Sequence, residues 1–423
     1  MRNRQILLPI VAVGLALGTA WAVRGKFGHE QGAAWAGAIG ALSLILVAKR
    51  RDWYPKTFRI LMAAAFGWGI SGMMSYGVIV GYGRATDFLN AFYGLLMLFV
   101  LGALYGFLGG GFFGLALVDS KTLKVKWHSL LAEMVAIGLL TYGLLINQLG
   151  WLMTPPRSEL WAVALGASIA LAWFIARNQY ASVMKVAVWS ALGAGFGFAF
   201  GNFLQVIGNS ARIDFNFWNV MEYSIGFFGG AGMAYGTFTS SWPASEVNPS
   251  RGYDLLAIVF VVLFIPFVVW EQSFVTERFE FVVDNGGSAA TIFYIKLAAI
   301  ISILLLFGFA LTRNYSSPKA SVETCPGIRQ FFILYTALYI FLSFLVTGLF
   351  VHPPEQYLYI INLLLILFLI SSAKESFEVE ANRPRTWLTV TVTSILIVAI
   401  LAIIAINSHE GMRGSNLRFE INQ

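Results

Sequence analysis

Long apolar stretches, each followed by a short polar or charged segment, succeed one another along almost the whole chain. An apolar stretch of about 18 or more residues is long enough to cross a bilayer as an α-helix. We therefore predict an all-α polytopic membrane protein with about 13 transmembrane helices. The predicted spans are 5–23, 32–48, 57–80, 90–118, 128–149, 160–176, 183–207, 218–239, 254–270, 291–312, 330–351, 357–372 and 387–406.

Composition supports this assignment. Of the 423 residues, 58% are hydrophobic and 12% are charged, and the mean hydropathy is +0.73. A soluble globular protein of this length does not need so much apolar surface. The links between the spans are short, so we expect no large soluble domain.

Glycine divides the chain into two parts. Of the 42 glycines, 34 lie in the first 248 residues and 8 in the last 175. Small residues at four-residue spacing let membrane helices approach closely, where lipid provides no hydrophobic drive for association. We predict a glycine-rich part of eight helices and a C-terminal part of five, 249–423, with the functional site in the glycine-rich part.

The glycine-rich part contains a possible internal duplication. Gly67-Trp68-Gly69 and Gly195-Phe196-Gly197 are followed at the same distance by Arg84 and Arg212. The corresponding repeats are 1–125 and 126–248, each with four helices and the same orientation. Parallel repeats of this kind recur among transporters. The alternative is chance similarity between two segments rich in glycine and aromatic residues.

We interpret the net charge of +7 first as evidence of how the chain is oriented in the membrane. A cytoplasmic N-terminus places most of the 28 Lys and Arg residues in cytoplasmic segments, as the positive-inside rule requires. The C-terminus then lies outside, and the protein is an integral membrane protein, of the inner membrane in a bacterium. The first span also resembles a signal peptide with a cleavage site at 20–22; we expect it to be retained. We expect no nucleic-acid partner, and the oligomeric state stays open.

The first predicted outer loop concentrates ionisable groups. Arg24, Lys26, His29 and Glu30 lie within seven residues, interspersed with glycines, between two apolar spans. Such a loop can dip into the protein and bind an anion. The alternative is a solvated turn whose cations contact lipid phosphates.

Two further cations are predicted to bind the same anion. Arg forms bidentate contacts with phosphate, sulfate or carboxylate, and Arg84 and Arg212 occupy equivalent positions in the two predicted repeats. The alternative role for each is a structural ion pair with the nearby Asp87 or Asp214.

Polar residues inside the predicted spans complete the candidate set. We predict that Glu222 carries a proton or pairs with Arg212, Arg84 or Lys296, since charged groups in the hydrocarbon are usually functional. Lys296 either joins Glu222 or extends to the interface. Asn202 and Gln205 either line the same cavity or hydrogen-bond between helices.

Other chemistries find little support in the sequence. The single cysteine, Cys325, allows no intramolecular disulfide, and the four histidines are dispersed, so we expect no metal site. No nucleotide-binding loop, dinucleotide fingerprint or nucleophile elbow is present, and we expect no cofactor.

Three functional hypotheses follow. The first is a secondary transporter or channel for a small anionic or polar solute, with membrane lipids as its other partners. The second is a membrane-embedded glycosyl- or acyltransferase that acts at the outer face, with His29 or Glu30 as general base. The third is a non-catalytic subunit that uses the polar cluster as a docking surface. Whether the protein is an enzyme stays open.

Overall fold

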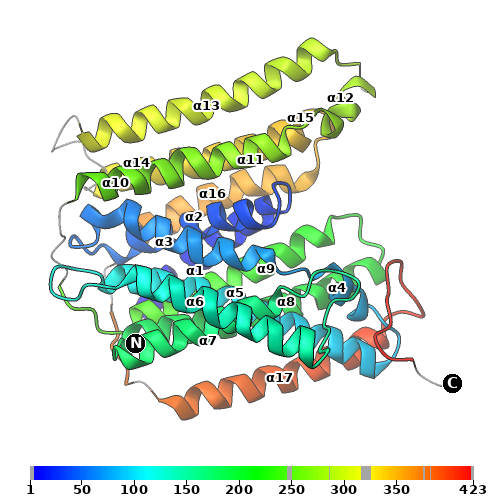
Figure 1. The fold of residues 1–423 in the computed structure, drawn as a ribbon. Coiled ribbons are helices and arrows are strands. Elements are labelled where there is room, and N and C mark those ends of the chain that lie inside the picture. Colours follow the sequence, from blue (N-terminus) through cyan, green and yellow to red (C-terminus); the bar gives the residue numbers. More distant parts are fainter. Residues whose placement is uncertain are drawn as a thin grey trace.

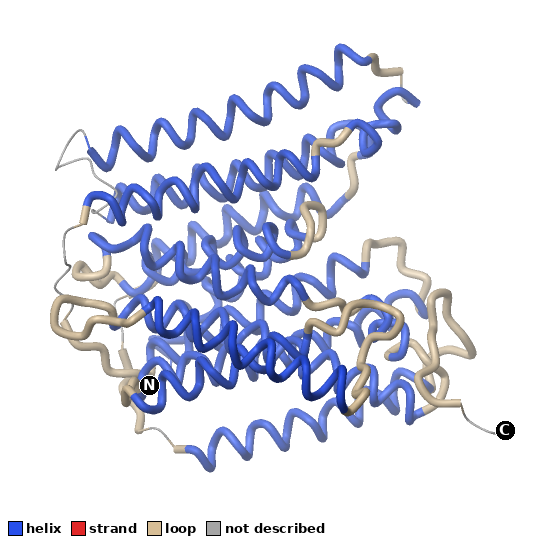
Figure 2. Tube along the Cα trace, in the orientation of Figure 1, coloured by secondary structure: helices blue, strands red, loops and turns tan. Residues whose placement is uncertain are grey.

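In the computed structural model the helices lie side by side along a common direction, and the links between them gather at the two ends of the bundle (Figure 1, Figure 2). The structure describes residues 4–244, 250–284, 286–315, 325–374, 377–381 and 383–420, and none of these residues forms a strand. The first helix begins at one end of the bundle, and the C-terminal segment lies at the other (Figure 1).

The prediction of an all-helical chain is confirmed for the described residues. Ten helical segments are long and apolar enough to cross a membrane. The α-helices are α1 (Arg4–Arg24), α2 (Glu30–Ala48), α3 (Thr57–Ile70), α4 (Gly77–Tyr82), α5 (Phe88–Val118), α6 (Trp127–Tyr142), α7 (Trp161–Arg177), α8 (Ala181–Ser210), α9 (Phe217–Phe238), α10 (Arg251–Ile258), α11 (Ile265–Ser273), α12 (Glu280–Asp284), α13 (Ala289–Tyr315), α14 (Cys325–Ser343), α15 (Leu349–Val351), α16 (Pro354–Ser372) and α17 (Pro384–Ile406). Three short 3-10 segments, η1 (Tyr54–Lys56), η2 (Ser71–Met73) and η5 (Thr276–Phe279), and three π-helical segments, η3 (Gly143–Gln148), η4 (Val259–Phe264) and η6 (Phe344–Gly348), complete the helical elements.

The segment predicted as one continuous span over 57–80 is instead a broken helix. After α3, the chain forms the 3-10 turn η2, becomes extended at Met74 and resumes as α4. Serine and glycine recur through this stretch, at Ser71, Gly72, Ser75 and Gly77, and both residues have lower helix propensity than alanine. The break therefore has a local cause in the sequence.

Glycines let the central helices approach closely around a buried tryptophan. A Cβ atom added at Gly37 would lie 2.6 Å from Trp68, and one added at Gly109 would lie 2.4 Å from it. These two glycines belong to α2 and α5, while Trp68 belongs to α3. The fully buried indole thus occupies space that the missing side chains leave, as expected where small residues bring helices together.

The C-terminal part surrounds this centre. Helices α14 and α16 pack against α1 and α2, and α17 packs against α5 and α8. Figure 1 shows α13 and α17 at opposite edges of the bundle. After α17, residues 407–420 fold across the bundle end: the Asn416 amide donates to the Gly81 carbonyl at 3.0 Å, and the Phe419 amide donates to Asn90 Oδ1 at 2.9 Å.

Candidate functional site

A cavity of about 800 Å³ lies at the bundle end where α1 ends and α2 begins. Most of its wall comes from the α1–α2 link, the break between α3 and α4, and the start of α9, and Arg157 and Asn416 add to it from two further segments. Charged and phenolic side chains on this wall are those of Arg24, Lys26, His29, Glu30, Tyr76, Arg157 and Glu222.

A buried ion pair joins two helices at this cavity. Arg24, the last residue of α1, donates from Nη1 to Glu222 Oε2 on α9 at 2.6 Å. Their side chains are only 2% and 7% exposed. The Tyr76 hydroxyl, from the helix break, donates to Glu222 Oε1 at 2.6 Å and accepts from Arg24 Nη1 at 2.9 Å. A buried charge pair is better tolerated when further hydrogen bonds support it, and Tyr76 bonds to both partners here.

Aromatic rings enclose the guanidinium. The Arg24 carbon Cζ lies 5.2 Å from the centre of the Trp21 ring and 5.8 Å from that of Tyr76. Tyr105 meets Trp21 edge-to-face at 5.4 Å. Within the described residues, Arg24 Nε, the Trp21 indole nitrogen and the Tyr105 hydroxyl have no hydrogen-bond partner. The aromatic rings therefore offer cation–π contacts to Arg24, and these three donors have no acceptor among the described residues.

His29 lies on the cavity wall next to this pair. Its Nδ1 is 3.0 Å from Arg24 Nη2. Desolvation and the neighbouring guanidinium lower the pKa of His29 to about 4, although part of the ring is exposed. The ring is therefore neutral at physiological pH. Because Arg can only donate, Nδ1 accepts this bond and Nε2 holds the proton, with no acceptor among the residues that the structure describes.

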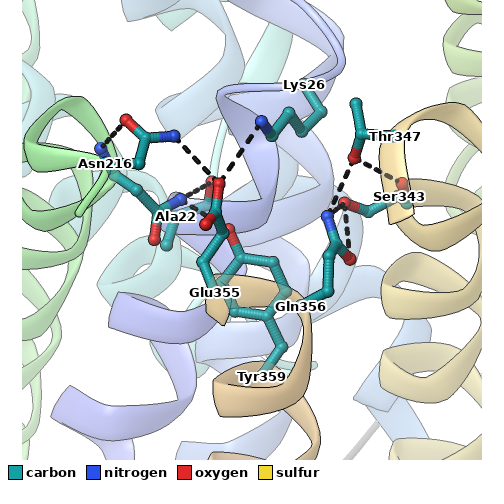
Figure 3. Close-up of polar contacts among 9 residues, drawn as sticks. Ala22, Lys26, Asn216, Ser343, Thr347, Glu355, Gln356 and Tyr359 are labelled. Atoms are coloured by element: carbon teal, nitrogen blue, oxygen red, sulfur yellow. Dashed lines mark hydrogen bonds and ion pairs between the residues drawn. The ribbon is translucent and has the colours of Figure 1, made fainter. Parts of the chain in front are cut away.

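A second ion pair involves Lys26, two residues after Arg24. Lys26 Nζ lies 3.6 Å from Oε1 of Glu355, and Asn216 Nδ2 donates to the same oxygen at 2.9 Å (Figure 3). Glu355 is 3% exposed and occupies the first turn of α16. The C-terminal part thus contributes a buried carboxylate next to the cavity.

Sequence reasoning missed Glu355. The signal was present, since Glu355 is an acidic residue directly after Pro353-Pro354 at the start of an apolar span. From the sequence, its partner Lys26 is recognisable only as one of the four ionisable residues between the first two spans. The pairing itself, across more than 300 residues of chain, depends on how α16 packs against α1.

Further hydrogen bonds continue from this pair (Figure 3). Asn219 Nδ2 donates to the Ala22 carbonyl at 3.0 Å and also to the Tyr359 hydroxyl. On the other side of α16, Gln356 Nε2 donates to Ser343 Oγ at 3.0 Å and to Thr347 Oγ1 at 2.9 Å. Polar contacts therefore link α1, α9, α14, η6 and α16 at one level of the bundle.

Two predicted cations line a neighbouring cavity. Arg84 and Arg212 lie on the wall of a cavity of about 890 Å³, which shares Asn216 and Trp218 with the first cavity. The alternative role predicted for them, pairing with Asp87 or Asp214, does not occur among the described residues. Asp87 instead caps α5, accepting from the Asn90 amide at 2.8 Å.

The remaining predicted residues line neither cavity. Lys296 on α13 donates from Nζ to Thr276 Oγ1 at 3.0 Å. Asn202 and Gln205 are fully buried on α8, where Asn202 Nδ2 donates to Gln205 Oε1 at 3.2 Å. A Cβ atom at Gly83 would lie 2.1 Å from Asn202 Oδ1, so this amide packs against the link that follows α4.

No protein-family model, curated protein or solved structure matches the chain. Among the described residues, no group of three or more His, Cys, Asp and Glu side chains is placed to hold a metal ion. The chemistry available at the site is that of paired charges, hydrogen-bond donors and one neutral imidazole. Such a set can bind an oxyanion and exchange a proton.

Proposed function

We propose that the protein is a secondary transporter or channel for a small anionic or polar solute, bound in the cavity that contains Arg24 and Glu222. The observation that carries this proposal is a buried Arg–Glu pair on the wall of a large cavity, directly beside a broken helix. Broken helices beside a solute site are a recurring feature of secondary transporters. A purely structural ion pair needs neither the break nor the cavity.

The mechanism follows from competition for one guanidinium. An oxyanion of the solute displaces Glu222 from Arg24, and His29 Nε2 and Lys26 donate further hydrogen bonds to it. Glu222 takes up a proton when it loses its cationic partner. When the solute leaves, Glu222 releases that proton and pairs with Arg24 again. Solute and proton therefore move together.

We also propose a membrane topology and an internal duplication for the protein. About 13 spans, a cytoplasmic N-terminus and an external C-terminus place both cavities at the outer face. The repeats 1–125 and 126–248 gain support from their internal packing, since α1 contacts α2 as α6 contacts α7, and α3 contacts α5 as α8 contacts α9. The two halves differ in that α1 is central, whereas most of α6 is exposed.

The test is ligand-dependent thermal stability of the purified full-length protein, followed by uptake into proteoliposomes. The panel contains acetate, succinate, citrate, sulfate, inorganic phosphate, glucose and a polyprenyl-phosphate-linked sugar. We expect a soluble anion to stabilise the wild type. The double variant Arg24→Gln/Glu222→Gln, which leaves no unpaired buried charge, should lose that stabilisation.

Glu222→Gln tests the coupling separately. It should retain binding, since the solute competes with the Glu222 carboxylate, but its uptake should no longer respond to a pH gradient. Lys124→Gln, at the opposite end of the bundle, is the matched control and should behave as wild type. Equal stabilisation of the wild type and the double variant by every anion would overturn the proposal.

A second candidate, the membrane-embedded glycosyl- or acyltransferase, is favoured by one observation. His29 is neutral, and both it and Glu30 expose part of their side chains on the cavity wall, as a general base must. Stabilisation by the lipid-linked sugar alone, with its turnover lost in His29→Gln or Glu30→Gln, would favour this enzyme. No response to any compound would favour the non-catalytic subunit.

A further inference from the structure

Several cationic side chains line the neighbouring cavity of about 890 Å³, and neither Arg24 nor Glu222 lines it. Arg84 comes from the link between α4 and α5, and Arg212 from the link between α8 and α9. The C-terminal segment after α17 adds His409 and Arg413 to the wall. One carboxylate, that of Glu410, also lines this cavity.

Arg84 is a buried cation without a carboxylate partner among the described residues. It is 8% exposed, and its guanidinium lies over the Trp218 ring at 5.2 Å. Its only hydrogen bond to a described residue runs from Nη1 to the Arg413 carbonyl at 3.1 Å, and Nε has no partner there. A buried charge normally has a counterion, because its removal from water costs several kcal/mol. The arrangement therefore leaves a position for an anion.

His409 and Arg212 present unused donors to the same space. Both ring nitrogens of His409 are buried and lack a partner among the described residues. Arg212 is exposed, in a left-handed backbone conformation with φ of 55° at the end of α8. Arg84, Arg212 and His409, from three segments, thus line one cavity beside Trp218, which is 44% exposed. Trp is enriched at membrane–water interfaces, at the level of the lipid headgroups.

We propose that this second cavity is a phosphate-binding site, formed by Arg84, Arg212 and His409 and completed by the C-terminal segment. A tetrahedral phosphate matches the forked geometry of two guanidinium groups and accepts from the imidazole as well. The phosphate belongs either to a phospholipid headgroup or to a soluble phosphate compound. This proposal does not depend on the function assigned to the Arg24 cavity.

Hydrogen bonds that do not involve Arg84, Arg212 or His409 hold the C-terminal segment in place. The Asn416 amide donates to Gly81, and Asn90 Oδ1 accepts from the amides of Arg418 and Phe419. Ser210 Oγ, at the end of α8, donates to the Ser408 carbonyl. His409 and Arg413 are therefore positioned before any ligand arrives, which reduces the ordering cost of binding.

The experiment measures phosphate binding by the full-length protein in two arms. In the first, inorganic phosphate is titrated against protein in detergent at constant ionic strength. In the second, the protein is extracted from vesicles of phosphatidylglycerol and phosphatidylcholine, and retained lipid is identified by native mass spectrometry. The first arm reports a soluble phosphate site and the second a headgroup site.

Arg212→Gln is the main variant, since Arg212 is exposed and its loss should not prevent folding. We expect it to weaken binding by about tenfold or more in whichever arm shows binding, since charge-assisted bidentate contacts are strong. His409→Gln should weaken binding less. Lys124→Gln, which removes an exposed cation that lines neither cavity, should leave binding unchanged.

Two results would overturn the proposal. One is no binding in either arm by the wild-type protein. The other is an equal effect of Arg212→Gln and Lys124→Gln, which would mean that general surface charge attracts phosphate. Either result leaves the transporter proposal standing, because that proposal depends on Arg24 and Glu222.

Discussion

At the scale of single residues, the chemistry of the site centres on Arg24. One guanidinium pairs with Glu222, donates to the Tyr76 hydroxyl and bonds to His29, while aromatic rings cover its faces. Each contact uses a property that Lys lacks: several fixed donors and a flat face for cation–π contact. Arg24→Lys would therefore not be a conservative change.

The pH dependence of stability should expose the state of His29. Its pKa of about 4 in the folded protein lies below the ordinary value of 6.5, so the unfolded chain binds the extra proton between these values. The stability due to the neutral ring is complete above pH 6.5 and is lost as the pH falls towards 4. We expect the melting temperature of the wild type to fall more steeply over this range than that of His29→Gln.

The comparison of wild type with His29→Gln isolates the contribution of the His29 ring. Arg24, Lys26, Glu30 and Glu222 share the cavity with His29 and are unchanged in both proteins. Replacement of the exposed His352 by Gln serves as the control and should leave the pH profile of the wild type intact. Parallel profiles for wild type and His29→Gln would contradict the assignment of a neutral His29.

At the scale of elements, the break between α3 and α4 shapes the cavity. A continuous helix would turn its side chains regularly around its axis, whereas the extended residues of the break bring Tyr76 to Glu222. The close approach of Gly72 to the start of α2 fixes this geometry. A Cβ atom at Gly72 would lie 2.5 Å from Glu30 Cα and 2.6 Å from the His29 carbonyl oxygen.

We expect Gly72→Ala to destabilise the protein by about 1–3 kcal/mol, the usual cost of overpacking a tight contact. It should also weaken solute binding, since it pushes the break away from His29 and Glu30. Chemical denaturation and the ligand titration measure the two effects. Gly77→Ala is the matched control, because nothing lies within 4 Å of a Cβ atom there. Equal behaviour of the two variants would contradict the role given to the break.

At the scale of the whole molecule, the glycine-rich part and the C-terminal part build the site together. The first part supplies the Arg24–Glu222 pair, and the second supplies Glu355 and the segment after α17. The link between α1 and α2 and the segment after α17, which line these cavities, lie at the end of the bundle opposite the start of α1 (Figure 1).

Cysteine labelling tests the proposed topology. In a Cys325→Ser background, a cysteine at Lys121, between α5 and α6, and one at Asp284, on α12, should react with a membrane-impermeant maleimide from opposite sides. These segments lie at opposite ends of the bundle (Figure 1). The background protein without an added cysteine should not react. Labelling of both positions from one side would overturn the topology.

The sequence alone predicted the helices because the signal for a membrane span is local. Hydrocarbon requires a long run of apolar residues and internally bonded backbone, so hydropathy reveals each helix without knowledge of its neighbours. Arg24, His29 and Glu30 could be recognised in the same way, as ionisable residues crowded between two apolar runs. The finer count of spans and the duplication stay predictions.

Only the tertiary structure decided which charges meet. Arg24 and Glu222 are 198 positions apart, and no local pattern specifies that they pair, that Lys296 bonds to Thr276, or that Glu355 reaches Lys26. The separation of Arg84 and Arg212 into their own cavity with the C-terminal segment was equally hidden. Local sequence sets the helix and its apolar length, whereas packing between helices determines the neighbours of each polar group and therefore its chemistry.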